Sequence, residues 1–164
     1  MKKTKGKLSF VDLFAGCGGL SLGLEKAGFK PVFVSELNDD ALAAYQANRS
    51  EDFPYFLEPE FFCNDVKDIV LNKKRIRKLK FDLKSRHGID VSKLDRGLDL
   101  LVGGPPCQGY SGIGLRRSYS VDKEQLPSNH LYQDMAYLID QLRPKIFLFE
   151  NVRGLLNSRW TNGG

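Results

Sequence analysis

Paired cysteines, clustered histidines and long hydrophobic runs are absent from this sequence of 164 residues. Its three cysteines show no Cys-x-x-Cys spacing and its two histidines stand apart, which argues against a disulfide scaffold and a zinc site. No apolar run approaches the ~20 residues that a membrane-spanning helix needs. The basic start is followed by an apolar stretch that Asp12 interrupts, so we expect no signal peptide. These absences predict a cytoplasmic protein that uses neither a membrane nor a metal.

The composition is that of an ordinary soluble domain. Hydrophobic residues make up 41% and charged residues 27% of the chain, which excludes a disordered chain, a collagen and a coiled coil. The length fits one domain with a core that needs no disulfides. We expect a basic N-terminal tail over residues 1–7 and a single domain over residues 8–164.

Positive charge is concentrated in one segment, residues 67–97. This segment holds eleven Lys and Arg residues against four Asp, a net charge of +7, whereas the whole chain carries +5. We expect a basic insertion in the domain, helical from about Lys67 to Lys80 and less ordered after Asp82. Such a segment can bind a polyanion, or it can be a solvated surface helix. The sequence leaves both interpretations open.

Apolar strands and amphipathic helices alternate along the chain. Short apolar segments predict strands at 8–14, 31–36, 61–63, 98–103 and 146–150. Helical spacing predicts helices at 20–27, after the cap residue Asn38, and between the cap residue Asn129 and Pro144. This alternation is typical of an α/β fold with a Rossmann-like, doubly wound parallel sheet and helices on both faces. In such sheets the ligand binds at the carboxyl ends of the strands.

The first strands end in residues suited to a nucleotide-like ligand. A turn with Gly16, Gly18 and Gly19 lets a ligand approach the backbone and the following helix N-terminus. Glu36 ends the second strand, where an acid can hold a ribose diol, and Asp65 after the third strand can accept from an adenine amine. Each also has an ordinary interpretation, a structural turn or a helix cap. Together they predict a cofactor that carries adenosine.

Two later strands end in residues suited to nucleophilic chemistry. Two prolines directly precede Cys107 in a polar, glycine-rich loop, which favours a reactive thiol over a packed one. Cys17 and Cys63 are instead predicted to be buried structural thiols. Glu150 ends the neighbouring strand, and an acid in such a half-apolar place can hold a proton. Thiol and carboxyl together predict a nucleophile with its acid.

Five motifs, in this order, resemble those of the cytosine-5 DNA methyltransferases. They lie at residues 12–19, 36, 64–66, 104–108 and 150–152, and the resemblance runs from Leu8 to about Leu156. It implies that S-adenosyl-L-methionine is the cofactor and double-stranded DNA the substrate. The cofactor-binding residues that it implies are Phe14, Gly16, Cys17, Gly18, Gly19, Glu36, Asp65, Val66, Pro106 and Leu131. The substrate-binding residues that it implies are Pro105, Gln108, Ser111, Asn151 and Val152.

The resemblance also implies a mechanism. Cys107 is the nucleophile that adds to C6 of a cytosine flipped out of the duplex, and Glu150 contacts the ring at N3. The addition breaks the aromatic conjugation and makes C5 reactive enough to take a methyl group. Loss of the C5 proton and elimination of Cys107 then restore the ring.

Three features of the family have no counterpart in this chain. They are a later Arg-x-Arg motif, the target-recognition region and a C-terminal cofactor-contacting motif. We therefore expect the N-terminal part of a catalytic domain, truncated on its C-terminal side, from a bacterial restriction–modification system. Three interpretations stay open: a fragment, a truncated gene product, or one half of a split enzyme whose partner is a separate C-terminal half. In each case we expect the chain to be inactive by itself. Two alternative functions are that of an RNA cytosine-5 methyltransferase and that of a non-catalytic cofactor-binding module.

Overall fold

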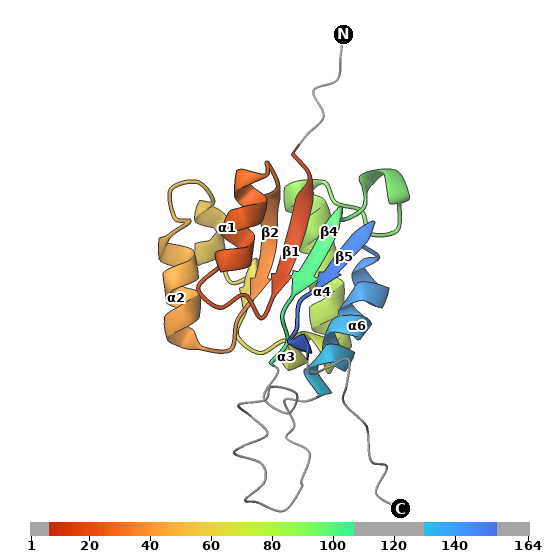
Figure 1. Cartoon of the computed structure of the whole chain (residues 1–164). Helices are drawn as coiled ribbons and strands as arrows, with labels where there is room; N and C mark the ends of the chain where they lie inside the picture. Colours follow the sequence, from red (N-terminus) through yellow and green to blue (C-terminus); the bar gives the residue numbers. More distant parts are fainter. Residues whose placement is uncertain (1–6, 107–129, 154–164) are drawn as a thin grey trace, which may run out of the picture.

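The computed structural model describes residues 7–106 and 130–153, and its centre is one parallel sheet (Figure 1). The described strands are β1 (Ser9–Leu13), β2 (Lys30–Ser35), β3 (Phe62–Cys63), β4 (Leu100–Gly103) and β5 (Ile146–Phe149). They lie in the order β3-β2-β1-β4-β5, and every neighbouring pair is parallel. The chain winds outward from β1 to β3 and then returns to β4 on the other side of β1. This order confirms the predicted doubly wound α/β sheet.

Helices cover both faces of the sheet. Those on one face are α1 (Gly19–Lys26) and α2 (Asp39–Ala47), and those on the other are α3 (Lys67–Val70), α4 (Lys73–His87) and α6 (Leu131–Leu142). Two short 3-10 helices, η1 (Pro54–Leu57) and η2 (Leu94–Arg96), lie in the connections. Asn38 caps α2, as predicted, by accepting from the Ala41 amide at 2.9 Å. The expected cap residue Asn129 lies outside the described residues. None of the described helices is long and apolar enough to cross a membrane.

The alternation of side chains along the strands divides the core between the two faces. Val11, Leu13 and Leu101 point toward α3, α4 and α6 and are fully buried. Phe10 and Val102 point toward α1 and are equally buried. The central strands therefore bury both of their faces, as strands of a parallel sheet do.

The edge strand β5 is apolar but exposed. Ile146 is 67%, Phe147 56% and Leu148 44% exposed. Ile146 and Leu148 are the register partners of Leu100 and Val102, so they continue the sheet face that α1 covers on the central strands. At β5 no helix of the described chain covers this face.

The basic segment forms two helices where a single helix was expected. α3 and α4 are separated at Asn72, whose side chain accepts from two amides in the first turn of α4. α4 continues past Asp82 to His87 and ends at Gly88, which has a φ of 70°. The expected loss of order after Asp82 is therefore wrong. The apolar side of α4 is part of the main core, with Ile76, Leu79 and Leu83 buried. That the segment is an insertion in the domain stays a prediction.

Candidate functional site

The glycine turn after β1 has a backbone conformation that most side chains avoid. Gly16 and Gly18 have φ values of 55° and 87°, a region that glycine adopts without strain. Phe14 has a φ of 60° although it carries a side chain. Strain of this kind is often found at functional sites. No pattern in the sequence predicts the strain at Phe14.

The turn has an open side and a packed side. A Cβ atom added to Gly16 or Gly19 would meet no atom of the described residues within 4 Å, apart from its chain neighbours and, for Gly19, the backbone of α1. A Cβ atom on Gly18 would lie 2.6 Å from Arg49 Nη1 and 2.7 Å from Tyr45 Cδ2. A ligand can therefore approach the backbone at Gly16 and Gly19, whereas Gly18 faces the protein interior.

Glu36 lies beside the glycine turn. Its Oε2 accepts from the Gly16 amide at 2.7 Å, and its Oε1 accepts from the Asn38 amide at 2.8 Å. The carboxylate thus bridges the turn after β1 and the start of α2. Each oxygen keeps a further lone pair, so the group can still accept from a hydroxyl of a ligand.

Asp65 and Val66 follow β3 at the same edge of the sheet. The Asp65 carboxylate accepts from the Lys67 amide at 2.9 Å, so the helix-cap interaction considered for this residue is present. That hydrogen bond uses one of the two carboxylate oxygens. Val66 is 3% exposed and belongs to the main core, which holds this segment in place.

Two segments far apart in the sequence meet at the ends of β4 and β5. The Asn151 side-chain amide donates to the Pro105 carbonyl at 3.1 Å. The Glu150 amide donates to the Gly103 carbonyl at 3.0 Å. A Cβ atom on Gly104 would lie 2.8 Å from Glu150 Oε2. The Glu150 carboxylate therefore lies against the backbone directly before the two prolines, where a glycine leaves room for it.

The remaining predicted site residues are only partly described. Cys107, Gln108 and Ser111 lie outside the described residues. Pro106 is exposed at the end of the segment that leads to them. Leu131 is half-buried and packs against the main core from the start of α6. The Val152 amide donates to Asn151 Oδ1 at 2.8 Å and helps to hold that side chain in place.

The two described cysteines have different environments. Cys63 is buried, and two acceptors lie within hydrogen-bond distance of its single S–H donor, Ser35 Oγ at 3.4 Å and the Asp65 carbonyl at 3.3 Å. Burial raises the pKa of the Cys63 thiol to about 11, so the prediction of a structural thiol is confirmed. Cys17 is exposed, so the prediction that it is buried is wrong; it lies on the turn between two glycines, where the chain faces outward. Within the described ranges, no three His, Cys, Asp or Glu residues group closely enough to hold a metal ion.

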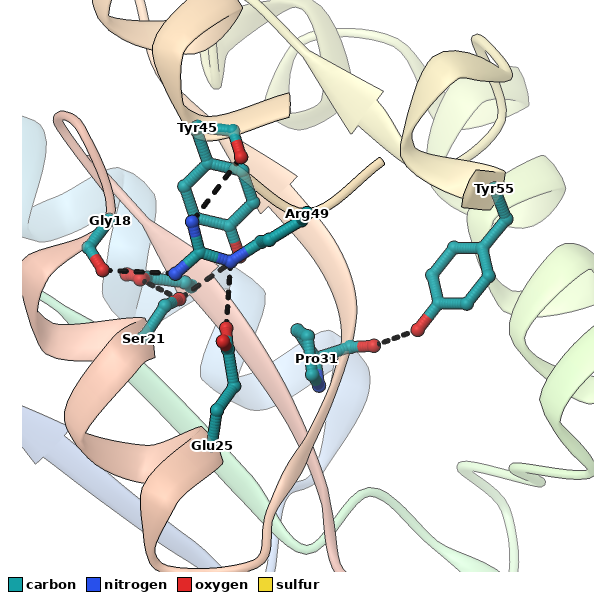
Figure 2. Close-up of polar contacts among 8 residues, drawn as sticks. Gly18, Ser21, Glu25, Pro31, Tyr45, Arg49 and Tyr55 are labelled. Carbon is teal, nitrogen blue, oxygen red and sulfur yellow. Dashed lines mark hydrogen bonds and ion pairs between the residues drawn. The ribbon is translucent and has the colours of Figure 1, made fainter. Parts of the chain in front are cut away.

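A buried arginine that the sequence did not reveal lies behind the glycine turn (Figure 2). Arg49 is 4% exposed, and its guanidinium donates to Glu25 Oε1 at 2.7 Å and to the carbonyls of Gly18 at 3.0 Å and Tyr45 at 3.3 Å. Its guanidinium carbon lies 3.8 Å from the centre of the Tyr45 ring. The carboxylate, the two carbonyls and the ring compensate for removing the charge from water. Arg49 comes four residues after Tyr45 and seven after Leu42, so helical spacing continues the buried side of α2 to this position, but an arginine there does not by itself indicate burial.

A buried acid joins the same network from β1. The Ser21 hydroxyl donates to Asp12 Oδ2 at 2.5 Å and lies 3.0 Å from the Tyr45 hydroxyl. Burial raises the pKa of Asp12 to about 7, although the Ser21 hydrogen bond and the Arg49 charge act in the opposite direction. The polar network beneath the turn consists of Asp12, Ser21, Glu25, Tyr45 and Arg49. It connects β1, α1 and α2 to the turn.

Comparison with known proteins finds relatives that are named as DNA methylases or methyltransferases. The model of a family described as C-5 cytosine-specific DNA methylase matches residues 8–162. A candidate type II methyltransferase of Methanocaldococcus jannaschii, M.MjaORF1200P, is 31% identical over 93% of this chain and 50% of its own length. The type II methyltransferase M.PspPI of a Psychrobacter species is 37% identical over 90% of this chain and 28% of its own length. The chain thus spans half or less of the length of these relatives.

Solved structures agree with the fold. A candidate DNA modification methyltransferase encoded within an Escherichia coli prophage has a TM-score of 0.60 and 29% identity, and covers 94% of this chain and 34% of its own. The Schizosaccharomyces pombe Dnmt2 methyltransferase has a TM-score of 0.53 over 93% of this chain and 36% of its own. At 18% identity, this second likeness shows the fold alone.

Proposed function

Because the chain belongs to the C-5 cytosine-specific DNA methylase family, we propose that it carries the cofactor-binding and nucleophile-bearing part of a DNA cytosine-5 methyltransferase. The proposed reaction transfers a methyl group from S-adenosyl-L-methionine to C5 of a cytosine in double-stranded DNA. Relatives named as type II methyltransferases support a role in restriction–modification. The observation that carries the proposal is the contact of Glu150 and Asn151 with the segment 103–105 that leads to Cys107.

The open side of the glycine turn fits the proposed cofactor. Glu36 offers carboxylate oxygens for the ribose hydroxyls, and the open backbone at Gly16 and Gly19 admits a ligand close to the N-terminus of α1. The cofactor supplies a methyl group activated on a positively charged sulfur. The chain's own residues proposed to hold it are Phe14, Gly16, Cys17, Gly18, Gly19, Glu36, Asp65, Val66, Pro106 and Leu131.

Cys107 and Glu150 are proposed to act on the base. The Cys107 thiolate adds to C6 of the cytosine while Glu150 hydrogen-bonds to N3 and stabilises the charge that develops. C5 then takes the methyl group, and loss of the C5 proton with elimination of Cys107 restores the aromatic ring and the thiolate. Glu150 is exposed at the end of β5, which leaves it accessible to a base that has left the duplex. Pro105, Gln108, Ser111, Asn151 and Val152 are proposed to shape the base site.

A further protein segment is proposed to complete the enzyme at β5. The exposed Ile146, Phe147 and Leu148 offer an apolar strand edge that such a segment can cover. That segment, the C-terminal half of the catalytic domain, would carry the target-recognition region. Without it we expect no methylation of DNA, because nothing offsets the few kcal/mol that unstacking the base costs.

A covalent trapping experiment tests the proposal. The chain is mixed with a C-terminal half from a relative, with S-adenosyl-L-methionine and with duplex DNA that carries 5-fluorocytosine in the relative's target sequence. The fluorine cannot leave C5 as a proton, so we expect a protein–DNA band that survives denaturation. Cys107→Ala should abolish the band, whereas Cys63→Ser, a conservative change at a cysteine outside the proposed site, should preserve it. A band that persists in Cys107→Ala contradicts the assignment of the nucleophile.

A competition experiment separates DNA from RNA. An excess of unlabelled duplex with the same sequence should suppress the trapped band, and the same mass of tRNA should not. Suppression by tRNA alone would favour the RNA methyltransferase rival.

A further inference from the structure

We propose that Arg49 is a positioning residue for cofactor binding, which orients the peptide between Gly18 and Gly19 so that the Gly19 amide faces the ligand. The inference rests on the proposed function, because the ligand is the amino-acid end of S-adenosyl-L-methionine. Arg49 acts from the packed side of the glycine turn, through Gly18 (Figure 2).

The carbonyl of Gly18 is held by two donors. Arg49 Nη2 donates to it at 3.0 Å, and the Leu22 amide of α1 donates to it at 2.9 Å. One donor belongs to the helix itself and the other reaches the turn from beyond the end of α2. The carbonyl is therefore fixed toward the interior even though Gly18, as a glycine with a φ of 87°, is free to adopt other conformations.

Fixing this carbonyl also fixes the amide on the other side of the same peptide. No described peptide bond is cis, and in a trans peptide the C=O and N–H groups point in opposite directions. With the Gly18 carbonyl directed inward, the Gly19 N–H is directed outward. Within the described part of the chain the space beside Gly19 is open, since a Cβ atom there would meet nothing within 4 Å except its chain neighbours and the backbone of α1. This amide at the start of α1 is the kind of donor that binds a carboxylate.

The remaining contacts explain why the residue is an arginine. Its planar fork donates at the same time to Glu25, to Gly18 and to the Tyr45 carbonyl, and it lies 3.8 Å from the centre of the Tyr45 ring. A lysine ammonium is a point charge on a flexible stem and cannot reproduce this set of directions. Glu25 and the Tyr45 ring thus hold the guanidinium in place, and the guanidinium holds the turn.

Two ligands that differ only in the amino-acid end test the inference. Calorimetric titration of the chain with S-adenosylhomocysteine and with 5′-methylthioadenosine compares binding with and without the carboxylate-bearing end. In Arg49→Met we expect the affinity for S-adenosylhomocysteine to fall at least roughly tenfold, as for the loss of a charge-assisted hydrogen bond. The affinity for 5′-methylthioadenosine should change less than about twofold. Arg49→Lys should lie between the wild type and Arg49→Met for the first ligand.

Arg86→Met is the matched control. Arg86 pairs with Glu58 at 2.8 Å and lies 5.3 Å from the centre of the Phe61 ring, so it also combines a carboxylate with an aromatic ring, but at an exposed position on α4. This variant should bind both ligands as the wild type does. Circular dichroism at the titration temperature establishes that each variant is folded. Should Arg49→Met not fold, Arg49→Lys provides the same test: its affinity for S-adenosylhomocysteine should fall more than its affinity for 5′-methylthioadenosine.

The outcomes separate this inference from the proposed function. An equal loss of affinity for both ligands in the Arg49 variants would show a general structural role and overturn the positioning role. Unchanged affinity for S-adenosylhomocysteine would overturn it as well. A wild-type chain that binds neither ligand would contradict the proposed cofactor site itself.

Discussion

The two halves of the carboxyl edge of the sheet are built differently. At the ends of β1 and β2, the glycine turn rests on the polar network beneath the turn, in which Asp12 and Arg49 are almost fully buried and each is hydrogen-bonded. At the ends of β4 and β5, Glu150 is exposed, and β5 leaves apolar side chains such as Ile146 and Phe147 in solvent. The first half meets its packing and hydrogen-bonding needs within the described chain, whereas the second half leaves an acid and apolar side chains exposed.

This difference suggests a division of labour between the two halves. A small ligand needs a rigid backbone that comes close to it, and the glycine turn with its buried support provides one. A flipped base needs a large partner that grips the duplex, and the β4–β5 half offers the surface on which such a partner can be built. We therefore expect cofactor binding to be a property of this chain, and methylation a property of a larger assembly.

The largest effect on stability is expected for Gly18→Ala, which changes the glycine at the centre of the half formed by the ends of β1 and β2. The new methyl group would force Ala into a φ of 87° and lie within 2.8 Å of Arg49 and Tyr45 side-chain atoms. Strain and overpacking together should lower the free energy of unfolding by ~2–5 kcal/mol. Urea denaturation measures this loss.

Gly19→Ala is the matched variant on the open side of the same turn. Its methyl group meets no atom of another described element within 4 Å, so the free energy of unfolding should change by less than ~1 kcal/mol. Its methyl group occupies the space through which the ligand approaches, and the affinity for the cofactor should fall. Equal stability losses in the two variants would mean that the turn does not have distinct packed and open sides.

The next largest effect is an expected loss of affinity for the cofactor when Glu36 is changed. Glu36→Ala removes both the proposed ribose contact and the bridge between Gly16 and Asn38. Cofactor binding should weaken by ~1.5–3 kcal/mol, the range for a hydrogen bond to a charged group. Calorimetry compares this variant with Glu51→Ala, which removes an exposed acid just after α2. Equal affinities in the two variants would remove Glu36 from the site.

The sequence predicted the strands and the doubly wound parallel sheet well, because these depend on local apolar patterns and on the alternation of strands and helices. It predicted the boundary within the basic segment poorly. The run of Lys and Arg between Lys73 and Lys80 suggests one continuous surface helix, and the cap at Asn72 and the stop at Gly88 were overlooked beside it. Both residues are recognisable signals for helix ends once they are sought.

Residues of the candidate site could be predicted from the sequence only where they belong to a recognisable motif. Glu36 and Glu150 stand at the ends of apolar strands, and the structure brings each to the glycine-containing segment beside it. The burial of Arg49 was missed because the partners that compensate for its charge, Glu25 on α1 and the Gly18 carbonyl, lie far from it in the sequence, so helical spacing alone does not reveal them. The exposure of Cys17 was missed for a similar reason, since cysteines are most often buried and the turn conformation alone directs this one outward.

A smaller effect should appear in the pH dependence of stability. The pKa of Asp12 is about 7 in the folded chain and about 4 when unfolded. The folded state therefore keeps a proton that the unfolded state releases, so this group's contribution to the free energy of unfolding falls as pH rises from about 4 to 7 and is constant above that. Asp12→Asn should remove this part of the slope. Thermal melts of both proteins between pH 4 and 8 test it, and parallel curves would contradict the buried-acid assignment.

The smallest effect on stability is expected at β5, and it tests the other half of the comparison. Ile146 is 67% exposed, so Ile146→Lys should change the free energy of unfolding by less than ~0.5 kcal/mol. The same change should reduce self-association of the chain in analytical ultracentrifugation, because a lysine on an edge strand opposes strand-to-strand pairing. Leu22→Lys is the control, since Leu22 is a 49% exposed apolar residue on α1, away from the sheet edge. If Ile146→Lys destabilises the chain by ~2 kcal/mol or more, as the loss of a buried residue does, then β5 is already covered in solution. The two halves would then be equally complete, and the proposed docking of a further segment at β5 would lose its basis.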